Sequence, residues 1–370
     1  MKKKILILAN SASGLYDFRN ELLLELLKEN EVHVSLPDEQ RCPELSDEGC
    51  IVHHTDIDRR GINPIKDIGL IRSYHRLMKE IKPEVVLTYT IKPNIYGGIC
   101  CRFRKVPYIT NITGLGSVFE NGGIIQKIVV CLYRMALKKA ACIFFQNQSN
   151  KQIFENFRIK GKSAQLVPGS GVNLDRHRFE EYPSIEEPVI FLYAGRIMKE
   201  KGIDELLYAA GRLKQQYPDV VFEIIGKYED DYKSTIEEYE QKGIIRLIEY
   251  QKDMHPYYRS AWAVLMPSYH EGMSNVILEA AATGRPVIAS DIPGCREGFE
   301  EGRTGFGAEA GNKESLYQAL ERFMELPYEK KAAMGQAARE KMKAEFDREK
   351  VVKAYLCQIN KNRRYQNEFI

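Results

Sequence analysis

The chain of 370 residues is long enough for two domains, each with a hydrophobic core of its own. Hydrophobic residues make up 44% of it and charged residues 28%, as is typical of a soluble globular protein. A net charge of only +3 argues against a general nucleic-acid-binding protein, and no apolar run approaches the ~18 residues that a membrane-spanning helix requires.

The N-terminus carries three lysines before an apolar run, as a signal peptide does. The apolar run at 5–9 is too short for that role and leads directly into residues 11–14, so we interpret it as the first β-strand.

The eight cysteines contain no C-x-x-C pair, and several lie in apolar runs, among them Cys100, Cys101, Cys131 and Cys142. We therefore expect reduced, buried thiols in a cytoplasmic protein, with neither a disulfide framework nor a metal site.

Short apolar segments alternate with longer amphipathic ones in the first half of the chain. The expected strands are at 5–9, 31–36, 51–55, 84–90, 108–113, 142–147 and 164–168. The expected helices are at 18–29, 68–81, 124–139 and 149–157. This alternation predicts an α/β domain over residues 1–175, with a parallel sheet that is covered on both faces.

Residues 175–188 interrupt the alternation, and we interpret them as an interdomain linker because they are charged, contain two prolines and show no periodicity. A second α/β domain is expected over residues 188–346. Its expected strands are at 189–194, 220–225, 245–250, 263–266 and 286–290, and its helices at 203–217, 231–242, 275–283, 313–325 and 329–345. The C-terminal segment 347–370 begins with a helix, at 347–360, that could extend beyond the second domain.

In parallel α/β sheets the ligand lies outside the carboxyl ends of the strands, so the segments that follow strands hold the informative residues. We predict two Rossmann-like domains with parallel sheets, whose post-strand loops face an interdomain cleft.

The most informative stretch is MPSYHEGMSNVILEA at 266–280, which follows a buried strand and enters a helix. Ser274 is the expected N-cap of that helix and Gly284 its C-terminal stop. Glu271 lies in the turn and Glu279 in the helix. Carboxylates suit the binding of hydroxyl groups, and the free N–H groups at a helix start favour an anion. A nucleotide-sugar combines both features.

A second motif, GRIMKEKGI at 195–203, also follows a strand and precedes a helix. Arg196 and Lys201 can converge on a diphosphate, while Gly195 permits close approach. Such a turn can also be merely basic and solvated, but its combination with the 266–280 stretch favours diphosphate binding.

Three segments in the first half carry weaker signals. Gly14, after the first strand, could let backbone N–H groups approach a phosphate, or it could belong to an ordinary βα turn. The segments 90–94 and 113–117 offer ammonium, amide and hydroxyl groups that could line the cleft. We interpret four histidines as structural because they lack metal-ligand spacing: His53, His54, His75 and His177.

The segment 124–139 is apolar with interspersed basic residues, and residues 102–105 add basic charge nearby in sequence. It can be an amphipathic helix that lies on an anionic membrane surface, or a core helix with an exposed basic edge, and the sequence does not favour either.

The motifs at 195–203 and 266–280, followed by GRPVI at 284–288, resemble the family 4 retaining glycosyltransferases. That family has the GT-B fold of two facing Rossmann-like domains. The segments YTIKPNIYG at 89–97 and NITGLG at 111–116 are similar to the branch of the family that builds bacterial capsules and lipid-linked oligosaccharides.

The resemblance implies a role for each candidate residue. Arg196 and Lys201 would hold the donor diphosphate and stabilise the leaving UDP, and Glu279 would bind the ribose. Glu271 would hold the donor sugar, aided by the backbone N–H groups of a turn comprising Gly272, Met273, Ser274 and Asn275. The segment 10–14, with Gly14, would close over the phosphates. The final helix, at 347–360, would cross back onto the first domain. The acceptor side would include Lys92, Asn94, Thr113 and Gly114.

The family requires no metal and no cofactor beyond its UDP-sugar donor. Two features depart from the family pattern: the N-terminal-domain histidine near the sugar is missing at 113–116, and the glycine pair after the first strand is reduced to Ser13-Gly14.

The expected reaction is retaining transfer of a hexosyl or N-acetylhexosaminyl group from a UDP-sugar to an undecaprenyl-diphosphate-linked saccharide, on the inner face of the cell membrane. The alternatives are a transferase with a soluble acceptor, a non-hydrolysing UDP-sugar epimerase and a non-catalytic nucleotide-sugar or lipid-binding protein.

Overall fold

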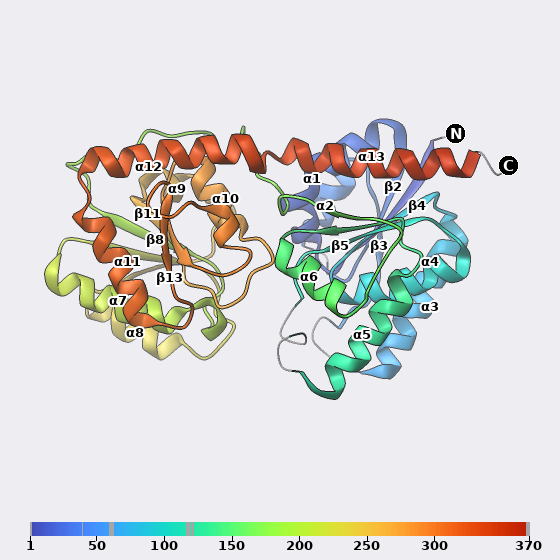
Figure 1. Cartoon of the computed structure of the whole chain (residues 1–370), viewed down its shortest axis with the longest axis horizontal. Coiled ribbons are helices and arrows are strands. Elements are labelled where there is room, and N and C mark those ends of the chain that lie inside the picture. Colours follow the sequence, from blue (N-terminus) through green and yellow to red (C-terminus); the bar gives the residue numbers. More distant parts are fainter. Residues whose placement is uncertain (1, 39, 59–62, 116–118, 120–121, 368–370) are drawn as a thin grey trace. The chain divides into compact units, whose positions relative to one another are not determined.

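The structure, a computed structural model, describes residues 2–38, 40–58, 63–115, 119 and 122–367. It divides into two compact units (Figure 1). Unit 1 comprises Met1–Ser170 together with Arg348–Ile370, and unit 2 comprises Gly171–Asp347.

Unit 1 is built on a seven-stranded parallel sheet with the strand order β3-β2-β1-β4-β5-β6-β7. The strands are β1 (Lys3–Leu8), β2 (Asn30–Leu36), β3 (Ile51–His54), β4 (Val85–Tyr89), β5 (Tyr108–Ile112), β6 (Cys142–Phe145) and β7 (Ala164–Leu166). The helices are α1 (Ala12–Glu29), α2 (Cys42–Asp47), α3 (Pro64–Ile81), α4 (Gly98–Arg104), α5 (Gly123–Leu137), α6 (Gln148–Asn156) and α13 (Arg348–Asn367), with a π-helical turn η1 (Pro93–Gly97).

Both faces of this sheet are buried. Ile5 and Ile7 of β1 belong to one apolar cluster, and Leu6 and Leu8 belong to another. Because successive strand residues point to opposite faces, this division places one core on each side of the sheet, as expected for a parallel sheet covered by helices.

The final helix α13 is anchored in unit 1 through Tyr355, which is fully buried. Its ring lies 4.5 Å from that of Phe144 between centroids, and its hydroxyl accepts a hydrogen bond of 2.5 Å from the amide of Asn111. At the start of the helix, Arg348 contacts both carboxylate oxygens of Glu21 on α1. The last helix of the chain is thus part of the core of the first unit.

Unit 2 has a six-stranded parallel sheet with the order β10-β9-β8-β11-β12-β13. The strands are β8 (Ile190–Ala194), β9 (Val221–Ile225), β10 (Arg246–Ile248), β11 (Ala263–Met266), β12 (Val287–Ser290) and β13 (Gly305–Ala308). The helices are α7 (Ile203–Gln216), α8 (Lys233–Gln241), α9 (His255–Ser260), α10 (Asn275–Ala282), α11 (Lys313–Glu325) and α12 (Tyr328–Lys341), with short turns η3 (Lys199–Lys201), η4 (Arg296–Gly298) and η5 (Met342–Phe346).

Each expected strand and helix has a counterpart; β11 and α11 have the expected ends, and the ends of the others are shifted. The expectation omitted β13, whose four residues include two glycines, and the short helices α2, α4 and α9. The expected start of the first helix at residue 18 is wrong by a turn and a half, because α1 begins at Ala12.

The linker expected at 175–188 is wrong, because this segment packs onto unit 2. The buried guanidinium of Arg285 donates hydrogen bonds to the carbonyls of Glu180 and Glu181, and the Tyr182 hydroxyl donates one to the carbonyl of Trp262. The division of the chain falls instead between Ser170 and Gly171.

All eight cysteines are free thiols. Cys100, Cys101 and Cys142 are buried as expected, but Cys131 is exposed, because it lies on the outer side of α5.

Candidate active site

The candidate site in unit 2 lies where the strand order changes direction. β8 is hydrogen-bonded to β9 on one side and to β11 on the other, so the chain proceeds from β8 toward one edge of the sheet and returns to β11. Loops after two such strands diverge and leave room for a ligand at the carboxyl end of the sheet. Residues 195–202 follow β8, and residues 267–274 follow β11.

These two loops meet through their backbones. The N–H of Tyr269 donates a hydrogen bond of 2.9 Å to the carbonyl of Glu200. Gly202 has a φ of +73°, and a Cβ atom there would lie 2.1 Å from the carbonyl oxygen of Pro267. Only glycine fits both the left-handed conformation and this approach.

The two cations predicted in the first loop are already paired with carboxylates. Lys201 Nζ lies 2.5 Å from Oε1 of Glu271, and both side chains are largely buried. Arg196 is more exposed, and its Nη1 lies 2.5 Å from Oε2 of Glu229. The buried Tyr193 hydroxyl donates a hydrogen bond of 2.7 Å to the carbonyl of Arg196, which fixes the loop backbone under the guanidinium. Both cations predicted to bind the diphosphate therefore lie on a loop of defined shape.

The helix start expected in the 266–280 stretch is confirmed. Ser274 is the N-cap of α10, its side chain accepts from the N–H of Ile277, and Gly284 follows the helix with a φ of +85°. The N–H of Ser274 itself donates to the carbonyl of Gly294 at 2.8 Å, so it is not available to a ligand. Within a helix the N–H groups of the first residues, here starting at Asn275, have no intrahelical acceptor.

The other residues of this turn differ in placement. The side chain of Met273 is buried in an apolar cluster, so only its backbone can face a ligand. Gly272 is partly exposed between Glu271 and Met273.

Glu279 lies on α10, and neighbouring side chains of unit 2 contact its carboxylate. Its Oε2 accepts a hydrogen bond of 3.0 Å from the Tyr258 hydroxyl, and its Oε1 lies 3.9 Å from Nε2 of His177. Burial raises the pKa of Tyr258 well above its usual value, and the neighbouring Glu279 charge adds to the effect, so this hydroxyl is a permanent donor.

The loop after β12 supports the turn that carries Glu271. Gly294 has a φ of +87°, and a Cβ atom there would lie 2.5 Å from the carbonyl oxygen of Glu271. Its N–H donates a 2.6 Å hydrogen bond to Glu297. Sequence reasoning identified this loop only by its place after a strand.

The loop after β9, residues 226–230, was missed. The N–H of Ile197 donates to the carbonyl of Lys227 at 2.9 Å, the N–H of Lys199 donates to Oδ2 of Asp230 at 3.0 Å, and Glu229 pairs with Arg196. Gly226, directly after the strand, was a signal that could have identified it.

The expected acceptor-side residues lie in unit 1. Lys92 pairs with Asp67 at 2.7 Å and is largely buried. Asn94 is 1% exposed and donates a 2.9 Å hydrogen bond to the carbonyl of Asn111. Its amide therefore lies in the core, where no acceptor substrate can reach it.

Thr113 and Gly114 follow β5 and are both partly exposed. Of the other residues in that motif, Leu115 is buried, and Gly116 and Ser117 lie outside the described residues.

Gly14 belongs to the first turn of α1 and not to a loop. Its N–H donates to the hydroxyl of Ser11 at 3.2 Å, and the N–H of Ala12 donates to the carboxylate of Asp38 at 3.0 Å. Two of the N–H groups expected to approach a phosphate here thus already have acceptors, and one of these acceptors is an anion.

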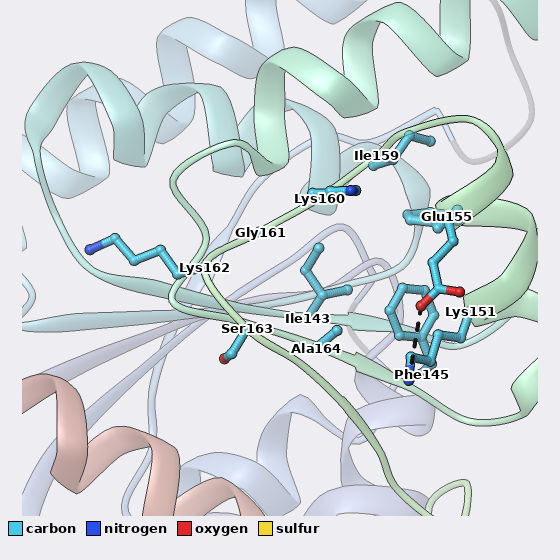
Figure 2. Close-up of a pocket in the computed structure, with 11 residues that line it drawn as sticks. Ile143, Phe145, Lys151, Glu155, Ile159, Lys160, Gly161, Lys162, Ser163 and Ala164 are labelled. Carbon is cyan, nitrogen blue, oxygen red and sulfur yellow. Dashed lines mark ion pairs between the residues drawn. The ribbon is translucent and has the colours of Figure 1, made fainter.

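Two cavities occur away from these residues. One, of about 220 Å³ beside β6 and β7, has an apolar floor that includes Ile143, with Lys160 and Lys162 at its margin (Figure 2). The other, of about 740 Å³, follows β12 and β13 and is lined in part by Asp291 and Glu309. No residue predicted for the donor or the acceptor lines either cavity.

The residues that the structure describes include no group of three or more His, Cys, Asp or Glu side chains placed for a metal ion. Metal independence stays a prediction. Among the helices described, none is both long and apolar enough to cross a bilayer.

Comparison with known proteins finds two family matches. Residues 175–341 match the family described as glycosyl transferases group 1, and residues 4–147 match glycosyl transferase 4-like.

Two curated relatives are named for lipid-linked acceptors. The chain is 23% identical to the N,N'-diacetylbacillosaminyl-diphospho-undecaprenol alpha-1,3-N-acetylgalactosaminyltransferase of Campylobacter jejuni, over 87% of this chain and 89% of that protein. It is 27% identical to the UDP-Gal:alpha-D-GlcNAc-diphosphoundecaprenol alpha-1,3-galactosyltransferase of Escherichia coli, over 71% and 72% of the two chains.

Among solved structures, Anabaena HepE in complex with UDP and glucose superimposes with a TM-score of 0.79 at 17% identity, covering 97% of this chain and 100% of that one. At this identity the match shows the fold.

Proposed function

We propose that this chain, which belongs to the family 4 glycosyltransferases with the GT-B fold, transfers a sugar from a UDP-sugar to an undecaprenyl-diphosphate-linked saccharide with retention of the anomeric configuration. The product would serve the synthesis of a capsule, O-antigen, exopolysaccharide or glycoprotein glycan.

The observation that carries the donor assignment is the placement of two cations and two carboxylates after the neighbouring strands β8 and β11. Arg196 and Lys201 lie on the loop after β8, Glu271 on the loop after β11, and Glu279 on the following helix. Cations suit the diphosphate, and carboxylates accept hydrogen bonds from ribose and sugar hydroxyls. One ligand, a nucleoside diphosphate sugar, uses all four.

The same cations supply the main catalytic effect in the proposal. As the bond between the anomeric carbon and the diphosphate oxygen breaks, negative charge develops on the leaving UDP, and Arg196 and Lys201 stabilise it. Glu271 releases Lys201 and takes hydroxyls of the donor sugar instead, which orients the anomeric carbon.

Retention is proposed to occur because the acceptor hydroxyl attacks the anomeric carbon from the same face from which UDP departs. The acceptor hydroxyl oxygen bonds to the anomeric carbon, and its proton passes to the departing phosphate oxygen. The reaction then needs neither a strong protein base nor a metal, which agrees with a site of two cations and hydrogen-bonding carboxylates.

The lipid-linked acceptor is supported by the two relatives whose names specify undecaprenyl-diphosphate substrates. It is also supported by the outer side of α5, where Ile124, Ile125 and Ile128 are 75%, 48% and 53% exposed. Lys127 and Arg134 lie among them, and α5 contains no acidic residue.

We define the α5 face by its exposed apolar residues Ile124, Ile125, Ile128 and Met135, with Phe103 of the adjoining α4. Apolar side chains surrounded by basic ones fit the interface of an anionic bilayer better than they fit water. The proposal therefore places the enzyme peripherally on the cytoplasmic face of the membrane, where its acceptor is anchored.

The proposed reaction is tested with labelled UDP-sugars and lipid extract from bacterial membranes in the presence of EDTA. Label should enter the lipid fraction with the wild type, and Arg196→Ala should lose most of this transfer. If label entered water-soluble sugars and not the lipid fraction, the enzyme would be a transferase with a soluble acceptor. Interconversion of free UDP-sugars without transfer would support an epimerase.

A further inference from the structure

Tyr258 is the one residue of the short helix α9 that is fully buried, and its hydroxyl points at a carboxylate. The ring packs in an apolar cluster with Ile277 of α10. Its hydroxyl donates the 3.0 Å hydrogen bond to Oε2 of Glu279. A phenylalanine would fill the same apolar space, so the hydroxyl itself requires an explanation.

The backbone of Tyr258 is fixed by a buried cation. Arg285 is fully buried, and its Nε donates a 2.9 Å hydrogen bond to the carbonyl of Tyr258. The same guanidinium donates to the carbonyls of Arg259 and Gly284. Burial lowers the pKa of Arg285 to about 10, so it remains charged at neutral pH. The hydrogen bonds from Arg285 therefore fix the backbone that carries the Tyr258 side chain.

We infer that Tyr258 is a positioning residue that orients the Glu279 carboxylate for the two hydroxyls of the donor ribose. This inference rests on the proposed function, in which Glu279 binds the ribose. The hydrogen bond from Tyr258 restricts the rotation of the carboxyl group, and the other carboxylate oxygen lies 3.9 Å from Nε2 of His177. A carboxylate accepts about four hydrogen bonds, so the bond from Tyr258 does not by itself prevent it from accepting the 2′- and 3′-hydroxyls.

The consequence is selectivity for ribonucleotides. A carboxylate held in one orientation binds a pair of neighbouring hydroxyls together, whereas a freely rotating one gains little from the second hydroxyl. The wild type should bind UDP more tightly than 2′-deoxy-UDP, and Tyr258→Phe should reduce that preference.

The test measures calorimetric Kd values for UDP and 2′-deoxy-UDP with the wild type, Tyr258→Phe, Glu279→Gln and the double variant. Hydrogen bonds to charged groups lead us to expect about 5- to 20-fold weaker UDP binding by Tyr258→Phe, with a smaller loss for 2′-deoxy-UDP. The donor KM should rise while kcat changes less than about 2-fold. The double variant should bind no more weakly than Glu279→Gln.

Tyr257→Phe is the matched control, because Tyr257 lies on the same helix and its hydroxyl has no hydrogen bond to Glu279 in the described structure. If Glu279→Gln weakens UDP binding while Tyr258→Phe behaves as Tyr257→Phe, the inference is overturned and the donor site stands. Equal weakening for UDP and 2′-deoxy-UDP, with a lower melting temperature, would also overturn it by showing a role in folding alone. If Glu279→Gln does not change the Kd for UDP, the assignment of Glu279 to the ribose is wrong, and the inference about Tyr258 has no basis.

Discussion

Each cation proposed for the diphosphate contacts a carboxylate in the structure, Lys201 with Glu271 and Arg196 with Glu229. A diphosphate has to replace these carboxylates to reach the cations. The exchange costs little at Arg196, whose pair is solvent-accessible, because exposed ion pairs contribute only about 0–1 kcal/mol. In this proposal, the carboxylates also keep the loops ordered before the donor binds.

This exchange predicts opposite effects for the two partners of the exposed pair. Glu229→Gln should tighten UDP binding by up to about 5-fold, because Arg196 then has no competing anion. Arg196→Ala should weaken it by about 10- to 100-fold through loss of a charged hydrogen-bonding group. Calorimetric titration with UDP measures both.

A matched control is Glu237→Gln, which removes an exposed carboxylate paired with Lys233 on α8. It should leave UDP binding unchanged. Weaker binding by Glu229→Gln would contradict the exchange and would show that Glu229 shapes the loop.

The residues of the candidate site could be predicted where residue type and position agree. Arg196, Lys201 and Glu271 are charged and follow apolar strands, and Ser274 is a strong N-cap. Asn94 shows the limit, because it also follows a strand but η1 turns its amide into the core. Tyr258 could not be identified, since a tyrosine among apolar residues is typical of any core.

At the scale of elements, β2 and β3 are joined by side chains as well as by their ladder. Nδ1 of His33 lies 2.9 Å from Nε2 of His53, and the rings stack with centroids 5.2 Å apart. Burial lowers the pKa of His53, and the charge of His33 lowers it further. One ring nitrogen must donate and the other accept, so the bond is lost when both rings are protonated.

This arrangement predicts that β3 loosens in acid. The unfolded chain takes up a proton at His53 near pH 6.5, before the folded chain does, so the contribution to stability is full above that pH and falls as the pH drops through this range. Amide hydrogen exchange in β3 should therefore accelerate relative to β5 between pH 7.5 and 5.5, beyond the intrinsic pH effect on exchange.

His53→Gln should flatten this relative dependence, whereas the exposed neighbour His54 should be replaceable by glutamine without effect. The same pH dependence in His53→Gln as in the wild type would refute the assignment.

Elements with strong periodicity were predictable, and those held by backbone contacts were not. The strand Gly305–Ala308 is too short and glycine-rich to give a pattern, and it forms because Gly305 fits against the Val287 carbonyl. The segment 175–188 is charged, yet Arg285 holds it through carbonyl groups, which every residue type possesses.

At the scale of the whole molecule, the chain passes from unit 1 to unit 2 after Ser170 and returns at Arg348. The return of the final helix to the first domain could be anticipated from the resemblance, but its anchoring residue could not, since Tyr355 acquires its buried partners from strands more than 200 residues earlier. The chain therefore connects twice the unit of the proposed donor site and the unit that carries the α5 face.

The α5 face predicts binding to anionic membranes by the full chain. The protein should sediment with vesicles that contain phosphatidylglycerol and dissociate at about 1 M salt, where the Debye length falls to about 3 Å. Ile124→Asp combined with Ile128→Asp should reduce the bound fraction several-fold, because carboxylates replace apolar contacts and oppose the lipid charge.

Ile185→Asp provides the comparison, since Ile185 is 69% exposed but lies in unit 2. It should bind vesicles as the wild type does. Equal losses in both variants would show that the α5 face has no special role.

The most direct test of the account is the NMR spectrum of the product formed by the purified protein, with EDTA present, from a UDP-sugar and a synthetic polyprenyl-diphosphate saccharide. The account predicts a new glycosidic bond whose anomeric configuration equals that of the donor sugar, and its absence with Arg196→Ala. An inverted anomeric centre, or an unchanged acceptor beside epimerised UDP-sugar, would contradict it.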